Sequence, residues 1–153
     1  MLLFIGVGAS AADVKLLPPE QAFRFAARAL DSRTVEARFT VADGYYLYRD
    51  KLRFAAEPQA VGLAAPALPP GKVKEDAFFG RVETFRDQVV VRLVLAGAQP
   101  GQAVTVRAES QGCADVGVCY PPNTQQVIVT LPAAGSPPGP LIEAHPQKKG
   151  WFN

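Results

Sequence analysis

The chain has very few of the residues that build metal sites. Its 153 residues include one histidine, His145, and two cysteines, Cys113 and Cys119. Protein zinc sites take three or four ligands from cysteine, histidine and acidic side chains. Two thiolates and one remote imidazole are too few, so no metal is expected and His145 is expected to be solvated.

The chain also lacks a charge excess and long apolar runs. Sixteen Lys and Arg residues nearly balance fourteen Asp and Glu residues, giving a net charge of +2 with no basic run. Nucleic-acid-binding domains are usually much more basic, so no nucleic acid partner is expected. No run approaches the roughly 20 apolar residues of a membrane-spanning helix.

The N-terminus resembles the second half of a secretory signal peptide. Residues 1–7 are apolar, and Ala9-Ser10-Ala11 has the small-x-small form of a cleavage site, but a positively charged start is missing. We therefore interpret residues 1–15 as a signal-peptide remnant or a disordered N-terminus, with an ordinary apolar N-terminus as the alternative. In an exported protein, two cysteines are usually bridged.

Short alternating or β-branched runs, separated by turn signals, indicate an all-β fold. Residues 18–23 would suit a helix start, but the alternation of Phe23, Phe25 and Ala27 favours a strand. Residues 72–80 are expected to form a polar loop. The predicted strands are residues 23–27, 34–41, 45–54, 88–95, 103–109 and 124–131.

This spacing of strands, without helical periodicity, predicts an immunoglobulin-like β-sandwich of two sheets. The cysteine pair is expected in a hairpin loop at one end. We assign residues 16–131 to this domain and residues 132–153, rich in Pro and Gly, to a linker or tail.

The two cysteines are too close in sequence to act as a strong structural staple. Closing a loop of about seven residues restricts the unfolded chain by only about 2.4 kcal/mol, against about 4.7 kcal/mol for a hundred-residue loop. A tethered pair can instead open and close during thiol exchange, and Gly112 and Gly117 offer the backbone freedom to bring the sulfurs together. The spacing alone leaves a redox-active and a structural disulfide equally open.

Two aromatic stretches are candidates for contact with the cysteines. Phe78 and Phe79 follow Asp76, and neighbouring residues of a strand point to opposite faces, so both cannot enter the core. One ring could cap the disulfide, because sulfur–aromatic contacts are favourable, although a plain loop anchor is the simpler interpretation. Tyr46 and Tyr48 share one strand face and could support the site.

Three motifs in order resemble one known family. Residues 112–122 (GCADVGVCYPP) are similar to the active-site motif of the N-terminal periplasmic domain of the bacterial thiol:disulfide interchange protein DsbD. Residues 45–51 (YYLYRDK, preceded by Asp43-Gly44) resemble its second signature, and residues 76–80 (DAFFG) resemble its cap loop. The resemblance covers roughly residues 16–131.

The resemblance implies a function and roles for single residues. Cys119 matches the cysteine that forms mixed disulfides with partners, and Cys113 matches the resolving cysteine. Phe78 matches the aromatic cap, and Asp76 matches an acid that assists proton transfer. The family often has a second acid where this chain has Ala77, which places the acid–base role in question.

The family also implies a location and partners. We expect a protein-disulfide reductase module in the periplasm, within a parent protein anchored in the inner membrane, and touching the membrane only through that parent. It would take electrons from the thioredoxin-like C-terminal domain of the parent. It would pass them, without any cofactor, to periplasmic disulfide isomerases and other thioredoxin-fold proteins. The alternative is a β-sandwich binding or adhesion domain with an inert structural disulfide.

Overall fold

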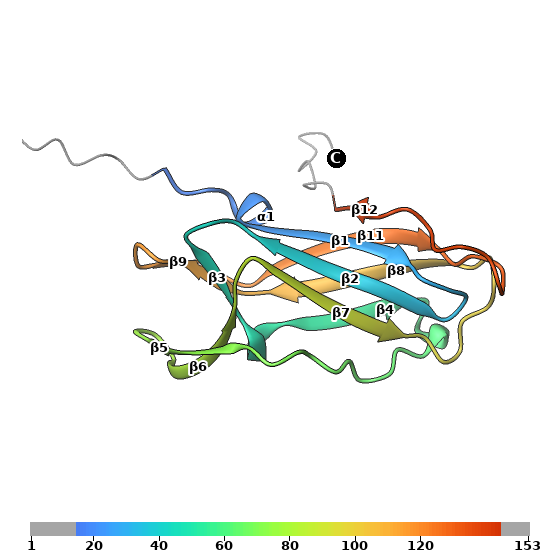
Figure 1. The fold of residues 1–153 in the computed structure, drawn as a ribbon, viewed down its shortest axis with the longest axis horizontal. Helices are drawn as coiled ribbons and strands as arrows, with labels where there is room; N and C mark the ends of the chain where they lie inside the picture. The colour runs from blue at the N-terminus through green and yellow to red at the C-terminus, as the bar shows by residue number, and fades with distance from the viewer. Residues whose placement is uncertain (1–14, 145–153) are drawn as a thin grey trace, which may run out of the picture.

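A computed structural model describes residues 15–144, which are built almost entirely from β-strands (Figure 1). No helix in this range is long and apolar enough to cross a membrane. The elements are α1 (Pro19–Ala22), β1 (Phe23–Ala29), β2 (Thr34–Val41), β3 (Tyr45–Tyr48), η1 (Arg49–Lys51), β4 (Arg53–Glu57), η2 (Gln59–Val61), β5 (Lys72–Asp76), β6 (Gly80–Phe85), β7 (Gln88–Val94), β8 (Ala103–Ser110), β9 (Gly112–Ala114), β10 (Val118–Cys119), β11 (Asn123–Thr130) and β12 (Ile142–Glu143).

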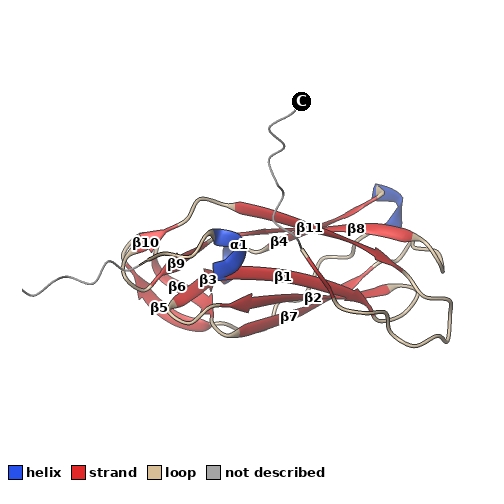
Figure 2. Ribbon diagram, turned by 90° about the horizontal axis from the view of Figure 1, so that it is seen from above, coloured by secondary structure: helices blue, strands red, loops and turns tan. Residues whose placement is uncertain are grey.

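Two sheets form the sandwich, and a third sheet extends it at one end. The order β12-β1-β2-β7 forms one layer and β11-β8-β4 the other (Figure 2). The third sheet, in the order β10-β9-β3-β6-β5, gathers at one end, where the β9–β10 and β5–β6 hairpins lie close together. The predicted immunoglobulin-like sandwich, with the cysteine hairpin at its end, is confirmed.

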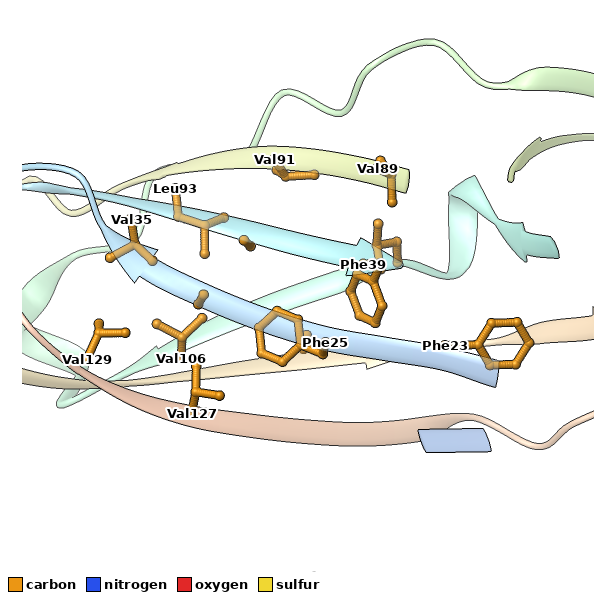
Figure 3. Close-up of a cluster of buried hydrophobic side chains, with 14 of the residues drawn as sticks. Phe23, Phe25, Val35, Phe39, Val89, Val91, Leu93, Val106, Val127 and Val129 are labelled. Carbon is orange, nitrogen blue, oxygen red and sulfur yellow. The ribbon is translucent and has the colours of Figure 1, made fainter. Parts of the chain in front are cut away.

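The core lies between the two main sheets and explains the alternation in the sequence. Inward-facing side chains of β1, β2 and β7 meet those of β8 and β11 (Figure 3). The Phe25 and Phe39 rings lie 5.1 Å apart, and Val106 and Val127 face them from the opposite sheet. Burial of such apolar side chains is the main favourable contribution to folding.

The strand predicted over residues 45–54 is in fact two strands in different sheets. The 3₁₀ turn η1 separates β3 from β4, which pairs with β8. All four residues of β3 are buried, because one face of the strand meets the core and the other meets the site described below. Because the aromatic residues of β3 show no alternation, the sequence does not reveal where β3 ends and β4 begins.

Two further predictions were wrong in detail. Of the loop predicted over residues 72–80, only residues 77–79 form a turn: residues 72–76 form β5, paired with β6, which begins at Gly80. As an edge strand exposed over much of its length, β5 keeps polar residues on both faces. In the strand predicted as buried over residues 88–95, Val90 and Val94 face solvent and are 41% and 45% exposed.

The chain ends of the described part differ from the expected pattern. Residues 19–22 form one helical turn before β1, where only a strand was favoured. Within the predicted linker, Ile142 lies opposite Ala27 in the β1–β12 pair. The domain boundary at residue 131 stays a prediction, and His145 and most of the predicted signal-peptide remnant lie outside the described residues.

A candidate redox site at the end of the sandwich

The two cysteines are joined across the β9–β10 hairpin. Cys113 and Cys119 are directly opposite in the antiparallel pair, with Cα atoms 4.0 Å apart, and their sulfurs form a disulfide. Cys113 is 1% exposed, whereas Cys119 is partly exposed. A reactant approaching from solvent therefore reaches the sulfur of Cys119 first.

The two glycines of the hairpin have different roles. Gly117 has φ of +101°, so it supplies the freedom at the turn that the sequence predicted. Gly112 does not have a positive φ: it lies opposite Leu47, and an added Cβ would lie 2.6 Å from Phe23 Cζ and even closer to the Tyr46 carbonyl. The prediction of backbone freedom was wrong for Gly112, which is needed for close packing of β9 on β3.

Tyr46 and Tyr48 converge with Asp76 beside the buried sulfur. Tyr46 lies opposite Cys113 in the β3–β9 pair. The Tyr46 and Tyr48 hydroxyls donate to Asp76 Oδ2 at 2.6 and 2.9 Å. The other carboxylate oxygen accepts from the backbone N–H groups of Phe78 and Phe79 at 2.8 and 2.9 Å. The carboxylate thus holds the tip of the β5–β6 hairpin against β3.

These contacts set the pKa values of the three side chains. Burial acts to raise the pKa of Asp76, but the hydrogen bonds from Tyr46, the two backbone amides and Tyr48 lower it to about 2. Burial, followed by the bond to Asp76, raises the pKa of Tyr46 to about 12 and that of Tyr48 further. At neutral pH the carboxylate is charged and both phenols keep their protons.

Tyr48 connects this carboxylate to the disulfide. Its hydroxyl oxygen lies 2.9 Å from the sulfur of Cys113 and 3.6 Å from that of Cys119. Because a disulfide has no proton, the single Tyr48 hydrogen goes to Asp76 in this oxidised form. After reduction, the hydroxyl oxygen can accept from the Cys113 thiol, or the O–H group can turn from Asp76 and donate to the thiolate.

Both phenylalanines of the cap loop are exposed at the tip of the β5–β6 hairpin. Phe78 and Phe79 are 58% and 47% exposed, so neither enters the core. The Phe79 ring packs edge-on against Tyr48 at 5.0 Å, with the Lys51 ammonium 5.2 Å from its centre. Phe78 lines a groove of about 170 Å³ together with residues of the cysteine hairpin, including Gly117.

The residue that follows the cysteine hairpin is hydrogen-bonded to the beginning of the domain. Tyr120, which follows Cys119, donates its hydroxyl to the Leu17 carbonyl at 2.5 Å. The Leu17 N–H in turn donates to the Tyr45 hydroxyl at 2.8 Å. The residue next to the exposed cysteine is therefore held in place from outside the hairpin.

The sequence did not reveal several residues around the disulfide. Arg86 forms a bidentate ion pair with Asp115, which lies between the cysteines. The Lys74 ammonium lies 5.1 Å from the centre of the Tyr46 ring. Val116 and Val118 expose 60% and 41% of their surface at the hairpin tip. Only the presence of two valines in so short a hairpin, one in the turn and one at the start of β10, could have indicated any of these residues.

The geometry supports thiol chemistry more directly than metal chemistry. Between residues 15 and 144, no cluster of three or more His, Cys, Asp or Glu side chains could hold a metal ion. The reactive element that is present is a disulfide with one buried and one partly exposed cysteine, beside a hydrogen-bonded carboxylate.

The sequence of this chain is similar to known proteins over most of its length. Residues 13–131 match the family model described as "Thiol:disulfide interchange protein DsbD, N-terminal". The chain is 50% identical over 137 residues to DsbD of Ralstonia nicotianae, covering 89% of this chain and 22% of that protein. It is 41% identical to DsbD 2 of Pseudomonas aeruginosa, covering 92% of this chain and 23% of the relative. The chain therefore spans less than a quarter of the length of these relatives.

Solved structures give the same assignment. The reduced N-terminal domain of Neisseria meningitidis DsbD superimposes with a TM-score of 0.69 at 35% identity, covering 85% of this chain and 96% of that domain. The complex of the DsbD and PilB N-terminal domains from the same organism matches with a TM-score of 0.63, also at 35% identity, covering 80% of this chain and 93% of the matched chain. The chain belongs to the family of DsbD N-terminal domains.

Proposed function

We propose that this domain is a periplasmic thiol–disulfide exchange module that works through Cys119 and Cys113. The observation that carries the proposal is the asymmetry of the pair. Cys119 is partly exposed, while Cys113 is buried against the hydroxyl of Tyr48. An inert structural bridge needs neither an accessible sulfur nor a hydrogen-bonding group beside the other one.

The exchange conserves electrons and protons at each step. A thiolate of an incoming dithiol attacks the Cys119 sulfur, breaks the bond to Cys113 and forms a mixed disulfide. The second thiol of the donor then displaces Cys119, leaving two protein thiols and an oxidised donor. In the second half-cycle, the Cys119 thiolate attacks a disulfide of the acceptor, and Cys113 resolves the mixed disulfide.

Tyr48, held by Asp76, lies where it can stabilise the thiolate of Cys113. When the Cys113 thiolate leaves, Tyr48 can turn its single hydrogen from Asp76 to the sulfur, which lies 2.9 Å from the hydroxyl oxygen. Because Asp76 stays ionised, it cannot supply the proton itself; its bond with Tyr48 in the oxidised form keeps the hydroxyl group beside the sulfurs. This role needs no second acid at Ala77.

Phe78 is proposed to act as the cap that limits access to the disulfide. It lines the groove that also touches Ala114 and Gly117 of the cysteine hairpin. Phe79 instead rests on Tyr48, so it supports the loop. An approaching partner would displace the Phe78 side chain, which is 58% exposed.

The partners are proposed to be thioredoxin-fold proteins. The structure of a related DsbD domain in complex with a PilB domain shows that a member of the family associates with another protein domain. We extend this to a thioredoxin-like domain of the parent protein as electron donor and to periplasmic disulfide isomerases as acceptors.

Trapping a mixed disulfide tests the two cysteine roles. In a Cys113→Ser variant, Cys119 should form a stable mixed disulfide with a thioredoxin-fold protein whose resolving cysteine has been removed. In a Cys119→Ser variant, the buried Cys113 should react at least about tenfold more slowly, because an attacking thiolate must be accessible. Faster trapping through Cys113 would reverse the roles, and no trapping by either variant would favour the inert bridge.

A further inference from the structure

One ion pair joins the turn between the two cysteines to a separate part of the fold. Arg86 lies in the turn between β6 and β7, and Asp115 lies in the turn between β9 and β10. The guanidinium donates to both oxygens of Asp115, at 2.7 Å from Nη2 and 3.0 Å from Nη1. Planar two-point contacts of this kind are stronger and more directional than single ones.

Further contacts hold both partners in place. Nη1 of Arg86 also donates to the Tyr45 carbonyl at 3.2 Å, and the guanidinium carbon lies 5.3 Å from the centre of the Tyr46 ring. The backbone N–H of Asp115 donates to the Gly44 carbonyl at 2.8 Å. The tip of the cysteine hairpin is therefore anchored to two other segments, the β6–β7 turn and residues 44–46.

The ion pair favours the charged form of both side chains. The bond to Arg86 lowers the pKa of Asp115, and the bond to Asp115 raises the pKa of Arg86. Both side chains are about two-fifths exposed, at 39% and 44%. Exposed pairs usually contribute little to folding, so a role in global stability is not the main expectation.

We propose that Arg86 is a positioning residue for thiol–disulfide exchange, acting through Asp115 to keep Cys113 and Cys119 aligned when the disulfide is open. This inference rests on the proposed function. In the oxidised form, the covalent bond already confines the five residues between the cysteines. In the dithiol form, the Arg86–Asp115 pair does so together with backbone hydrogen bonds, including the one from Asp115 to Gly44.

The consequence is an effect on the redox equilibrium. Without the ion pair, the turn gains freedom mainly in the dithiol form, so closing the disulfide costs more conformational entropy. The equilibrium against a reference dithiol then shifts toward the reduced protein. A residue that only stabilised the fold would affect both redox forms alike and leave this equilibrium in place.

The test is the equilibrium constant between the Cys113–Cys119 disulfide and dithiothreitol, measured for the intact chain and its variants by trapping free thiols. We expect Arg86→Gln and Asp115→Asn each to shift the constant toward the dithiol by about threefold to tenfold. The double variant should shift it no further than either single one, because both remove the same contact. Arg86→Lys should recover part of the effect, since one donor and the charge remain.

A matched control comes from a similar ion pair far along the sandwich. Arg107 and Glu57 pair across β8 and β4 at 3.1 Å with comparable exposure. Arg107→Gln should leave the constant unchanged. A constant that is also unchanged in Arg86→Gln, or that favours the disulfide, would overturn the inference. Failure of the proposed function is a separate result, because it is read from the unmodified chain failing to exchange disulfides with any thioredoxin-fold protein.

Discussion

Four hydrogen bonds converge on the carboxylate of Asp76, and they make the site sensitive to acid. The folded pKa of about 2 lies below the ordinary value of 3.8, so the bonds stabilise the fold above pH 4. This stability is lost as the pH falls toward the folded pKa, because the unfolded chain then binds the proton more readily.

We therefore expect the unfolding free energy to fall by about 2 kcal/mol more in the unmodified protein than in Asp76→Asn between pH 5 and pH 2. Urea unfolding at a series of pH values measures this difference. Parallel pH profiles for the two proteins would mean that Asp76 is not held ionised by its partners.

Tyr48 is the residue through which Asp76 reaches the sulfurs. Tyr48→Phe keeps the ring against Phe79 but removes the hydroxyl that lies 2.9 Å from Cys113. We expect resolution of a mixed disulfide on Cys119 to slow several-fold, with a changed pH dependence, because the Cys113 thiolate loses a donor. Stopped-flow measurement of release from a preformed glutathione mixed disulfide checks this, and Tyr45→Phe, whose hydroxyl binds Leu17 instead, is the control. Equal rates would exclude a proton role for Tyr48.

At the level of elements, the β9–β10 hairpin depends on close approach to β3. Gly112→Ala places a methyl group against the Tyr46 carbonyl and the Phe23 ring, so we expect a loss of about 1–3 kcal/mol of unfolding free energy. Denaturant unfolding measures it. Gly101→Ala is a control, because Gly101 has a φ of +77° and no atom lies within 4 Å of an added Cβ. This change introduces backbone strain without a steric clash. It should leave the redox equilibrium unaffected. A tolerated Gly112→Ala would show that β9 can move away from β3.

The β5–β6 hairpin carries the proposed cap. We expect Phe78→Ala to raise the alkylation rate of the reduced protein by iodoacetamide several-fold, because Phe78 lines the groove beside the cysteine hairpin. Val73→Ala, an equally exposed change on β5, is the control. An unchanged rate in Phe78→Ala would end the cap proposal.

The sandwich could be predicted from the sequence, but the arrangement at its end could not. Alternation in β2 and β8 reports one buried and one exposed face, which is enough for the main sheets. In β3 both faces are buried, so no alternation marks its end, and in β5 both faces carry polar residues. The shared face of Tyr46 and Tyr48 made them candidates, but without the family resemblance nothing in the sequence placed Tyr48 against Asp76, 28 residues away, and Cys113, 65 residues away.

For the whole molecule, we expect the β1–β12 pairing to affect the stability of the fold but not the redox equilibrium of the disulfide. β12 pairs with β1, and Ile142 packs on the main core. We expect a chain ending at Leu131 to lose about 1–2 kcal/mol of unfolding free energy relative to one ending at Ala144. Its redox equilibrium should stay the same, because β12 and the disulfide belong to different sheets. A changed equilibrium would show that the two regions are coupled.

The most direct test of the central claim is a redox titration of the Cys113–Cys119 pair. The protein is equilibrated with dithiol–disulfide buffers of graded potential, and free thiols are trapped and counted. An exchange module should become reduced at potentials above about −300 mV, within reach of thioredoxin-fold donors. A pair that stays oxidised well below about −300 mV would be a structural disulfide and would contradict the account.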